Sequence, residues 1–219
     1  LIKVMILPKP RKIEAERYIG GLSHFKKIDN PIKLSANESA LGASPKAIKA
    51  FERDKDKIFN YPETDSNSLR NVLSKKFNIE FDRIICGAGS DQIFDLICKL
   101  FIEVGDEVIV SEFDFIMHRI YASLHGAKVL LAREKNYKAS VDEILKKVTD
   151  KTKIVFIANP NNPTGTYLTK NEMLNLRKKL RSNILMVVDD AYFEFLNSED
   201  FTSGLDLFKD AANVLVTRT

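Results

Sequence analysis

The chain has 219 residues, of which 44% are hydrophobic and 29% are charged. This length allows one large domain, or one domain with an arm, and is sufficient for a core. The formal net charge of +4 is mild and both signs are interspersed, so we expect neither a nucleic-acid nor a membrane partner. With only two cysteines, we do not expect a disulfide scaffold. We also expect no membrane span, because the sequence has no long apolar run, and no signal peptide, because it has no leader pattern. Composition therefore predicts a cytoplasmic α/β protein.

The first part of the chain shows few regular elements. Prolines and glycines interrupt residues 1–40, which predicts an irregular arm. A Ser-Pro pair at residues 44–45 predicts a helix that runs to about Arg53. Ser66 opens a second expected helix, with apolar residues at helical spacing up to Phe77.

After residue 82, short apolar runs alternate with amphipathic stretches. The expected strands are Arg83–Cys86, Glu107–Val110, Lys128–Leu131, Lys153–Ala158, Ile184–Val188 and Asn213–Val216. The expected helices are Ser90–Ile102, Phe115–His125, Ser140–Lys147, Thr169–Arg181 and Leu205–Asp210. Strands that are apolar throughout are buried on both faces, and strand–helix alternation predicts a mostly parallel sheet between two helical layers. The expected fold is a three-layer α/β/α, which binds ligands at the carboxyl ends of its strands.

The first expected strand leads into residues 86–92, which read CGAGSDQ. Gly87 and Gly89 permit a tight turn close to a ligand. Ser90 or Asp91 would cap the helix that follows, and the free N–H groups at a helix start attract phosphate. The pattern is neither G-x-G-x-x-G nor a P-loop. From the residues alone, a phosphate site and an ordinary capped glycine turn both stay open.

Two later strand ends also carry unusual polar residues. Residues 159–165 read NPNNPTG, in which amide side chains suit a ligand oxygen and two X-Pro bonds raise the chance of a cis peptide. A surface turn is the alternative. Residues 187–192 read VVDDAY and place two carboxylates at the end of a buried strand, where they are costly unless paired. They predict a counter-charge for a cationic ligand group, or else a helix cap that faces solvent.

In their order and spacing, these motifs resemble those of the class I and II aminotransferases, which have the aspartate-aminotransferase fold and use pyridoxal phosphate. NPNNPTG at 159–165 is the most specific match, and DDAY at 189–192 resembles the family's D-[ED]-A-Y. Within this superfamily the likeness is greatest to histidinol-phosphate aminotransferases. Their motifs L-x-x-N-E-N-P-x-G-x-S-P, R-Y-P and G-x-G-S-D-E are similar to residues 34–45, 60–62 and 87–92.

The resemblance implies pyridoxal 5′-phosphate as the cofactor and assigns residues to it. The implied cofactor-binding residues are Gly89, Ser90, Asp91, Phe115, Asn162, Asp189, Tyr192 and Tyr61. The first three would hold the phosphate, and Phe115 would stack on the pyridine ring. Asn162 and Tyr192 would reach the phenolic oxygen, and Asp189 would pair with the protonated ring nitrogen. Asp189 and Tyr192 are therefore the implied catalytic residues of this chain.

The resemblance also implies partners and a substrate. Tyr61 would contact the phosphate from the other subunit, so a homodimer is expected, and Asn37 would approach the amino- or keto-acid substrate. His24, His118 and His125 are not expected to be catalytic, since the family often has Tyr at position 118. No metal site is expected.

The resemblance divides the chain into an N-terminal arm with the first helix, residues 1–60, and an incomplete large domain, residues 61–219. We expect the C-terminal small domain of the family to be absent from this chain. The family's reactive lysine lies in S-K-x-x-x-x-x-G-x-R, and the chain reaches Thr219 before such a motif. The implied reaction is transamination of histidinol phosphate with 2-oxoglutarate in histidine biosynthesis. We expect the fragment to be inactive alone, because Lys170 and Lys209 precede the last strand and cannot replace that lysine.

Alternative functions share part of this pattern. Aromatic aminotransferases and phosphothreonine decarboxylases carry similar Asn-Pro and Asp-Ala-Tyr motifs. A truncated remnant could bind a ligand or partner without chemistry, and the absent lysine favours it. A nucleotide-binding module that uses the turn at residues 87–91 would leave the Asn-Pro loop unexplained.

Overall fold

The computed structural model describes residues 13–22 and 31–219. Its contacts form two compact units, one of residues 13–17 with Gly87–Thr219 and the other of Tyr18–Cys86. The expected division into residues 1–60 and 61–219 concerns the domains of a longer protein and stays a prediction. The irregular arm falls partly on residues 1–12 and 23–30, which lie outside the described residues, as does His24.

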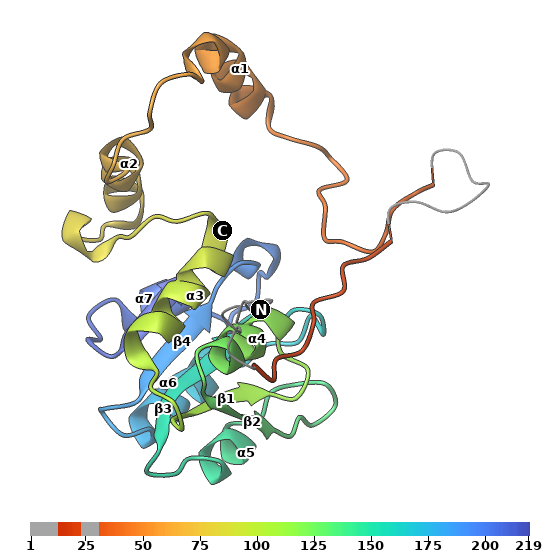
Figure 1. Ribbon diagram of the computed structural model, residues 1–219, viewed down its shortest axis with the longest axis vertical. Coiled ribbons are helices and arrows are strands. Elements are labelled where there is room, and N and C mark those ends of the chain that lie inside the picture. Colours follow the sequence, from red (N-terminus) through yellow and green to blue (C-terminus); the bar gives the residue numbers. More distant parts are fainter. Residues whose placement is uncertain (1–12, 23–30) are drawn as a thin grey trace, which may run out of the picture. The chain divides into compact units, whose positions relative to one another are not determined.

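Five parallel strands form one sheet in the larger unit, in the order β2-β1-β3-β4-β5 (Figure 1). The strands are β1 (Glu107–Ser111), β2 (Lys128–Ala132), β3 (Thr152–Ala158), β4 (Leu185–Asp189) and β5 (Val214–Thr217). Each lies within one residue of its expected range. For β1, β3 and β4 the prediction succeeds because these short apolar runs are buried on both faces, which leaves little freedom for another assignment. The edge strands β2 and β5 are partly exposed.

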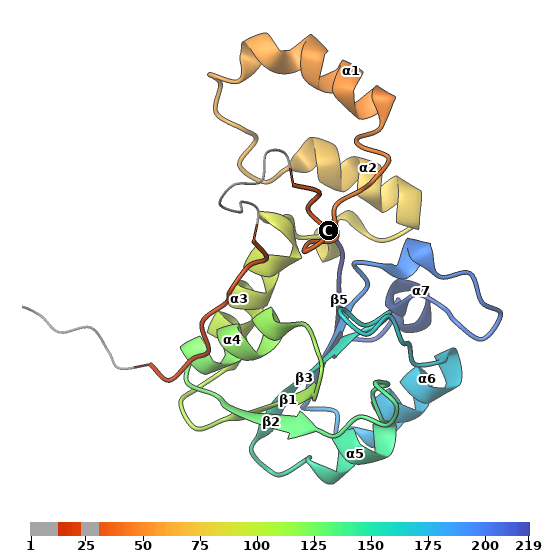
Figure 2. The ribbon, with the colours of Figure 1, turned by 90° about the vertical axis from the view of Figure 1, so that its right-hand side faces the viewer.

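Helices cover both faces of this sheet (Figure 2). They are α3 (Gly89–Phe101), α4 (Ile116–Leu124), α5 (Val141–Lys146), α6 (Lys170–Lys179) and α7 (Gly204–Phe208), with a 3₁₀ turn η3 (Phe193–Phe195). Helices α3 and α4 lie on one face, and α5, α6 and α7 lie on the other. The expected three-layer α/β/α fold with a parallel sheet is confirmed. Within the described ranges, no helix has the length and apolar character that crossing a membrane requires.

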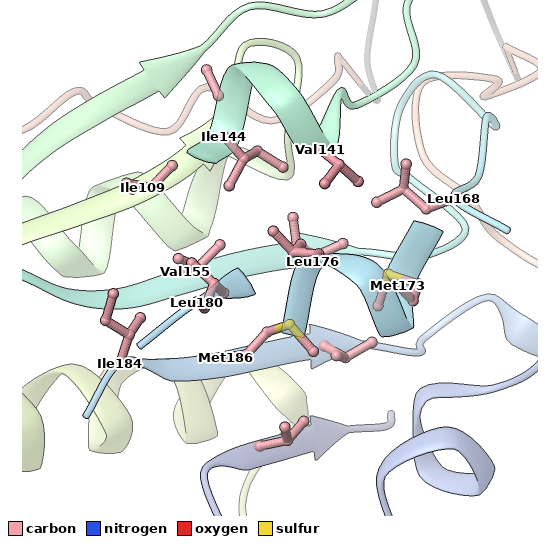
Figure 3. Close-up of a cluster of buried hydrophobic side chains, with 14 of the residues drawn as sticks. Ile109, Val141, Ile144, Val155, Leu168, Met173, Leu176, Leu180, Ile184 and Met186 are labelled. Carbon is pink, nitrogen blue, oxygen red and sulfur yellow. The ribbon is translucent and has the colours of Figure 1, made fainter. Parts of the chain in front are cut away.

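Alternate residues of the central strands β1, β3 and β4 supply two separate cores. Ile109, Val155 and Met186 face the layer of α5 and α6. There they join Ile144 and Leu176, which are fully buried (Figure 3). Burying one such side chain contributes about 1.5–3 kcal/mol relative to leaving it exposed.

The opposite face of the sheet carries the second core. Val108, Ile154 and Val187 point to this side, where Phe94 of α3 and Ala122 of α4 cover them. All five side chains are fully buried. Because the strands are anchored on both faces, their carboxyl ends form a rigid edge for the loops that follow.

The smaller unit contains the two helices expected before residue 82. They are α1 (Pro45–Asp54) and α2 (Asn67–Phe77), accompanied by the 3₁₀ turns η1 (Lys55–Lys57) and η2 (Phe81–Arg83). In the described part of the chain, these elements contain no buried residue. The side chain of Arg70 fastens α2 to η2, since it donates to the Phe81 carbonyl at 2.9 Å and lies over the Phe81 ring.

The strand expected at Arg83–Cys86 is wrong. Arg83 ends the turn η2, and Ile84 has an extended backbone with φ −113° and ψ 126° but belongs to no strand. Local sequence can favour an extended conformation, whereas a strand also needs a neighbour that accepts and donates its ladder hydrogen bonds. No described segment pairs with these residues.

Candidate functional site

The strand order reverses direction between β1 and β3, which is the point where sheets of this kind bind ligands. The chain passes from β1 to β2 on one side and then returns to β3 on the other, so the loops after β1 and β3 diverge. These loops carry two of the predicted residues, Phe115 and Asn162. The Asn161 side chain joins the two loops, because its Nδ2 donates to the Phe113 carbonyl oxygen at 3.1 Å. The Asn-Pro motif and the predicted stacking residue therefore lie at the same edge of the sheet.

The loop that follows β3 is held by its own amides. Asn159 accepts from the Leu168 N–H at 2.7 Å and donates to the Leu168 carbonyl at 3.1 Å, which closes the loop at its base. Asn161 donates to the Thr164 hydroxyl at 2.9 Å. The peptide bonds before Pro160 and Pro163 are both cis, as the sequence pattern suggested. Asn162 itself is half-buried at the tip of this loop.

Asp189 ends β4 with a buried carboxylate that is 6% exposed. Its Oδ1 accepts hydrogen bonds from the Ala191 N–H and from the Thr217 hydroxyl, each at 3.2 Å. Several donors converge on this group because burying an ionised carboxylate without partners is costly. The Asp189 carboxylate thus lies at the sheet edge with one backbone donor and one side-chain donor, and its role as a counter-charge stays a prediction.

His118 lies between two buried carboxylates. Its Nδ1 is 2.6 Å from Oδ2 of Asp114, and its Nε2 is 3.7 Å from Oδ2 of Asp189. The ring stacks on Phe156 with centroids 4.7 Å apart, and its edge contacts Phe115. Burial alone would lower the pKa of His118, but the two carboxylates outweigh burial and raise that pKa to about 9. At neutral pH the imidazole is therefore a cation beside Asp189.

Sequence reasoning gave His118 no role. One signal was present, because Asp114 and His118 are four residues apart at the start of a helix that follows a strand, a spacing that brings side chains together. The contact with Asp189 is different, since it joins loops far apart in the chain and could not be read from spacing.

The second carboxylate of the motif, Asp190, points elsewhere. It is 1% exposed and accepts from the N–H groups of Gly204 and Leu205, at the start of α7. Burial raises the pKa of Asp190 to about 7. Gly204 is required for this approach, because a Cβ there would lie 2.7 Å from Cγ1 of Val188. The two adjacent carboxylates therefore have separate tasks, one at the sheet edge and one in helix docking.

The glycine turn leads directly into α3. The helix begins at Gly89, which has φ +72°, and Ala88 is its N-cap, so the expected capping by Ser90 or Asp91 is wrong. Instead, Gln92 accepts from the Ala88 N–H at 2.7 Å. The first N–H groups of a helix carry partial positive charge and attract anions.

Two residues of the first turn make contacts that the sequence did not predict. The Ser90 N–H donates to the Thr219 hydroxyl at 3.4 Å, and Asp91 accepts from the Tyr121 hydroxyl at 2.8 Å. Thr219, which sequence reasoning missed, thus adds a hydroxyl to the start of α3. The hint available was its position two residues after the end of β5.

The remaining predicted site residues are Tyr192, Tyr61 and Asn37. Tyr192 is half-buried beside Phe195, with ring centroids 6.1 Å apart. Tyr61 is fully exposed and Asn37 is exposed, and both belong to the smaller unit. The roles of these three residues stay predictions.

The residues at the strand ends of the larger unit have a chemistry that fits pyridoxal phosphate. This group combines an anionic phosphate, a flat aromatic ring and a ring nitrogen that can carry a proton. The helix start at Gly89 suits the anion, Phe115 offers an aromatic face, and the buried carboxylate of Asp189 suits a cationic nitrogen. Within the described residues, no group of three His, Cys, Asp or Glu side chains is placed to hold a metal ion.

Solved structures with a similar fold include aminotransferases. The histidinol-phosphate aminotransferase of Sinorhizobium meliloti in complex with pyridoxal-5′-phosphate matches at a TM-score of 0.79 and 23% identity. It covers 84% of this chain and 50% of that one, and at this identity it shows the fold alone. A putative histidinol-phosphate aminotransferase from Erwinia carotovora atroseptica gives a TM-score of 0.81 at 27% identity, over 87% of this chain and 56% of that one.

Sequence comparison then gives the family. Residues 29–219 match the family model "Aminotransferase class I and II". The histidinol-phosphate aminotransferase of Pelagibacter ubique is 57% identical over 98% of this chain, and that of Paramagnetospirillum magneticum is 42% identical over 97%. The chain belongs to the class I and II aminotransferases. It spans 60% and 58% of the length of these two relatives.

Proposed function

We propose that the native protein is a pyridoxal-phosphate-dependent histidinol-phosphate aminotransferase and that this chain supplies its cofactor-binding part. The observation that carries the proposal is the buried carboxylate of Asp189 at the carboxyl end of β4. The 57% identity to the Pelagibacter ubique enzyme supports the choice of substrate. Amino-group exchange with glutamate and 2-oxoglutarate would complete the reaction.

Asp189 would hold the proton on the ring nitrogen of the cofactor. When bound, pyridoxal phosphate supplies a ring that withdraws electrons from the substrate carbon, and it does so best with a protonated nitrogen. The Thr217 hydroxyl and the Ala191 N–H donate to Asp189, and cationic His118 lies 3.7 Å away. These donors and the nearby positive charge surround the carboxylate that would pair with the protonated nitrogen.

The other strand-end residues would bind and orient the cofactor. The N–H groups at the start of α3, from Gly89 to Asp91, would hold the phosphate. Phe115 would stack on the ring, and its own ring is fixed edge-on to His118 at 5.7 Å. Asn162 and Tyr192 would donate to the phenolic oxygen.

The proposal extends to substrate, partner and location. Asn37 would contact the substrate, and Tyr61 would reach the phosphate from a second subunit, so the native enzyme would be a homodimer. The reaction uses small, charged amino and keto acids, for which the cytoplasm is the expected compartment. The 219 residues include no S-K-x-x-x-x-x-G-x-R segment.

The test uses the full product of the native gene. We expect it to bind pyridoxal phosphate and to turn over histidinol phosphate with 2-oxoglutarate at a kcat/KM at least roughly 100-fold above that for phenylalanine, because buried contacts made to substrate polar groups discriminate strongly. Phosphothreonine should yield no carbon dioxide. Asp189→Asn should lower kcat, while Asp142→Asn, in the first turn of α5, should leave it unchanged.

Other results would replace the proposal. A preference for phenylalanine would indicate an aromatic aminotransferase, and release of carbon dioxide from phosphothreonine would indicate a decarboxylase. Cofactor binding without turnover of any of the three would indicate a catalytically dead remnant. Failure to bind the cofactor would remove the basis of the proposal.

A further inference from the structure

We propose that Thr217 is a positioning residue that saturates Oδ1 of Asp189 and thereby reserves Oδ2 for the cationic ring nitrogen of the cofactor. This inference rests on the proposed function and adds to it. It names the carboxylate oxygen that faces the ring and the residue that selects it.

Thr217 is held firmly in place. It ends β5, is 4% exposed, and pairs in register with Asp189 of the neighbouring strand. The Asp190 N–H donates to the Thr217 carbonyl at 3.0 Å, so the two strands remain bonded up to this point. The hydroxyl of Thr217 then reaches Oδ1 of Asp189 at 3.2 Å. A β-branched side chain on a paired strand has few alternative rotamers, which fixes the direction of this donor.

The two oxygens of Asp189 are therefore unequal. An ionised carboxylate offers about two acceptor positions on each oxygen. Oδ1 already receives two donors, the Ala191 N–H and the Thr217 hydroxyl. Oδ2 faces His118 at 3.7 Å, which is too far for a hydrogen bond, and the buried Nε2 of His118 has no hydrogen-bond partner. Oδ2 is thus the oxygen with acceptor capacity left for a ligand N–H.

Without the Thr217 hydroxyl, this distinction would be lost. The terminal torsion of Asp is broad and roughly two-fold, so the carboxylate turns readily unless hydrogen bonds hold it. Oδ1 would then have one free position, and either oxygen could turn toward His118. The contact with a ring nitrogen would weaken because its acceptor would no longer have a fixed direction.

The experiment compares two ligands that differ at one ring atom. The full product of the native gene is titrated with pyridoxamine 5′-phosphate and with its 1-deaza analogue, in which carbon replaces the ring nitrogen. The ratio of the two dissociation constants reports the contact with Asp189. It does not depend on turnover. We expect the wild type to prefer the nitrogen ligand by roughly 10- to 100-fold, the range for a hydrogen bond between charged groups.

Thr217→Val keeps the shape of the side chain and removes the hydroxyl. We expect it to reduce the ratio by about five-fold, as the loss of one hydrogen bond would. Thr217→Ser should keep the ratio within about two-fold of the wild type, since it retains the donor. Thr217→Cys, which has only a weak donor, should behave like the valine variant and replaces it if that variant does not fold.

Thr152→Val is the matched control. Thr152 is also a buried strand threonine whose hydroxyl makes a hydrogen bond, accepted from the Thr149 N–H at 2.9 Å, but it lies at the amino end of β3. This variant should leave the ratio unchanged even if it lowers stability. A ratio that Thr217→Val and Thr217→Cys leave within about two-fold of the wild type would overturn the inference. A wild type that binds neither ligand would instead overturn the proposed function.

Discussion

The charge of the buried side chain His118 depends on its neighbours. Asp114 and Asp189 raise its pKa to about 9, above the ordinary 6.5, although burial acts in the other direction. When folding raises the pKa of a basic group, its protonated form stabilises the folded state. The stabilising contribution of His118 is therefore complete below pH 6.5 and is lost as the pH rises through 9. Unfolding measured against pH should show this loss.

Asp114→Asn should lower the pKa of His118, because it removes the closer of the two carboxylates. Titration of His118 followed by NMR would show the change, and the loss of stability between pH 6.5 and 9 should become smaller in the variant. Asp95→Asn is the control, since Asp95 contacts His125 at 2.7 Å and not His118. An unchanged titration of His118 in the Asp114 variant would contradict the assignment.

Asp190 gives a dependence of the same sign but in a lower pH range. Its pKa of about 7 lies above the ordinary 3.8 because burial disfavours the charge, so wild-type stability falls as the pH rises from about 4 to 7. Asp190→Asn cannot ionise and keeps an oxygen for the Gly204 N–H. The free energy of unfolding of the variant minus that of the wild type should therefore increase between pH 4.5 and 7.5 in urea titrations. A difference that stays constant with pH would count against a buried, titrating Asp190.

The site could be predicted only where its chemistry lies within one local motif. Asp189 was predictable because a carboxylate at the end of a buried strand is costly unless it is paired. Thr217 could not be found this way, since its partner Asp189 is 28 residues away and the contact exists only after β4 and β5 pair. The prediction that Ser90 or Asp91 caps α3 was wrong, because the helix begins at Gly89 and its N-cap is Ala88.

At the scale of the elements, the position of a strand was predictable and its pairing was not. Lys153–Ala158 agrees with β3 because its apolar run requires burial on both faces. Arg83–Cys86 has similar local character but has no partner strand in the described chain, so it stays outside the sheet. Local patterns report burial, whereas hydrogen-bonded pairing depends on a distant segment.

Helix α6 offers a direct test of local capping. Thr169 accepts from the Glu172 N–H, and Glu172 accepts from the Thr169 N–H at 2.8 Å, which completes a capping box. Thr169→Ala should reduce the free energy of unfolding by about 1 kcal/mol, measured by urea denaturation. Ser140→Ala at the N-cap of α5, where the side chain makes no capping hydrogen bond, should cost clearly less. Equal losses in the two variants would show that the box adds nothing.

For the whole molecule, the double-sided core sets the stability. Leu176 of α6 is fully buried against the sheet, whereas Leu174 of the same helix is 44% exposed. Leu176→Ala should cost about 2–5 kcal/mol through lost burial and a residual cavity, measured by urea unfolding. Leu174→Ala makes the same chemical change and should cost less than about 1 kcal/mol. Similar costs at the two positions would mean that α6 does not pack as described.

The backbone of Asp189 is bonded on both sides within the sheet. Its carbonyl accepts from the Asn159 N–H at 3.0 Å, and its register partner on the other side is Thr217. The main chain at this residue cannot shift without breaking two strand pairs at once. Mutations that accumulate in the surrounding loops can therefore change the surroundings of the carboxylate while the carboxylate stays in place. Under the proposed function, descendants of such a scaffold would diverge in substrate and still inherit the same ring chemistry.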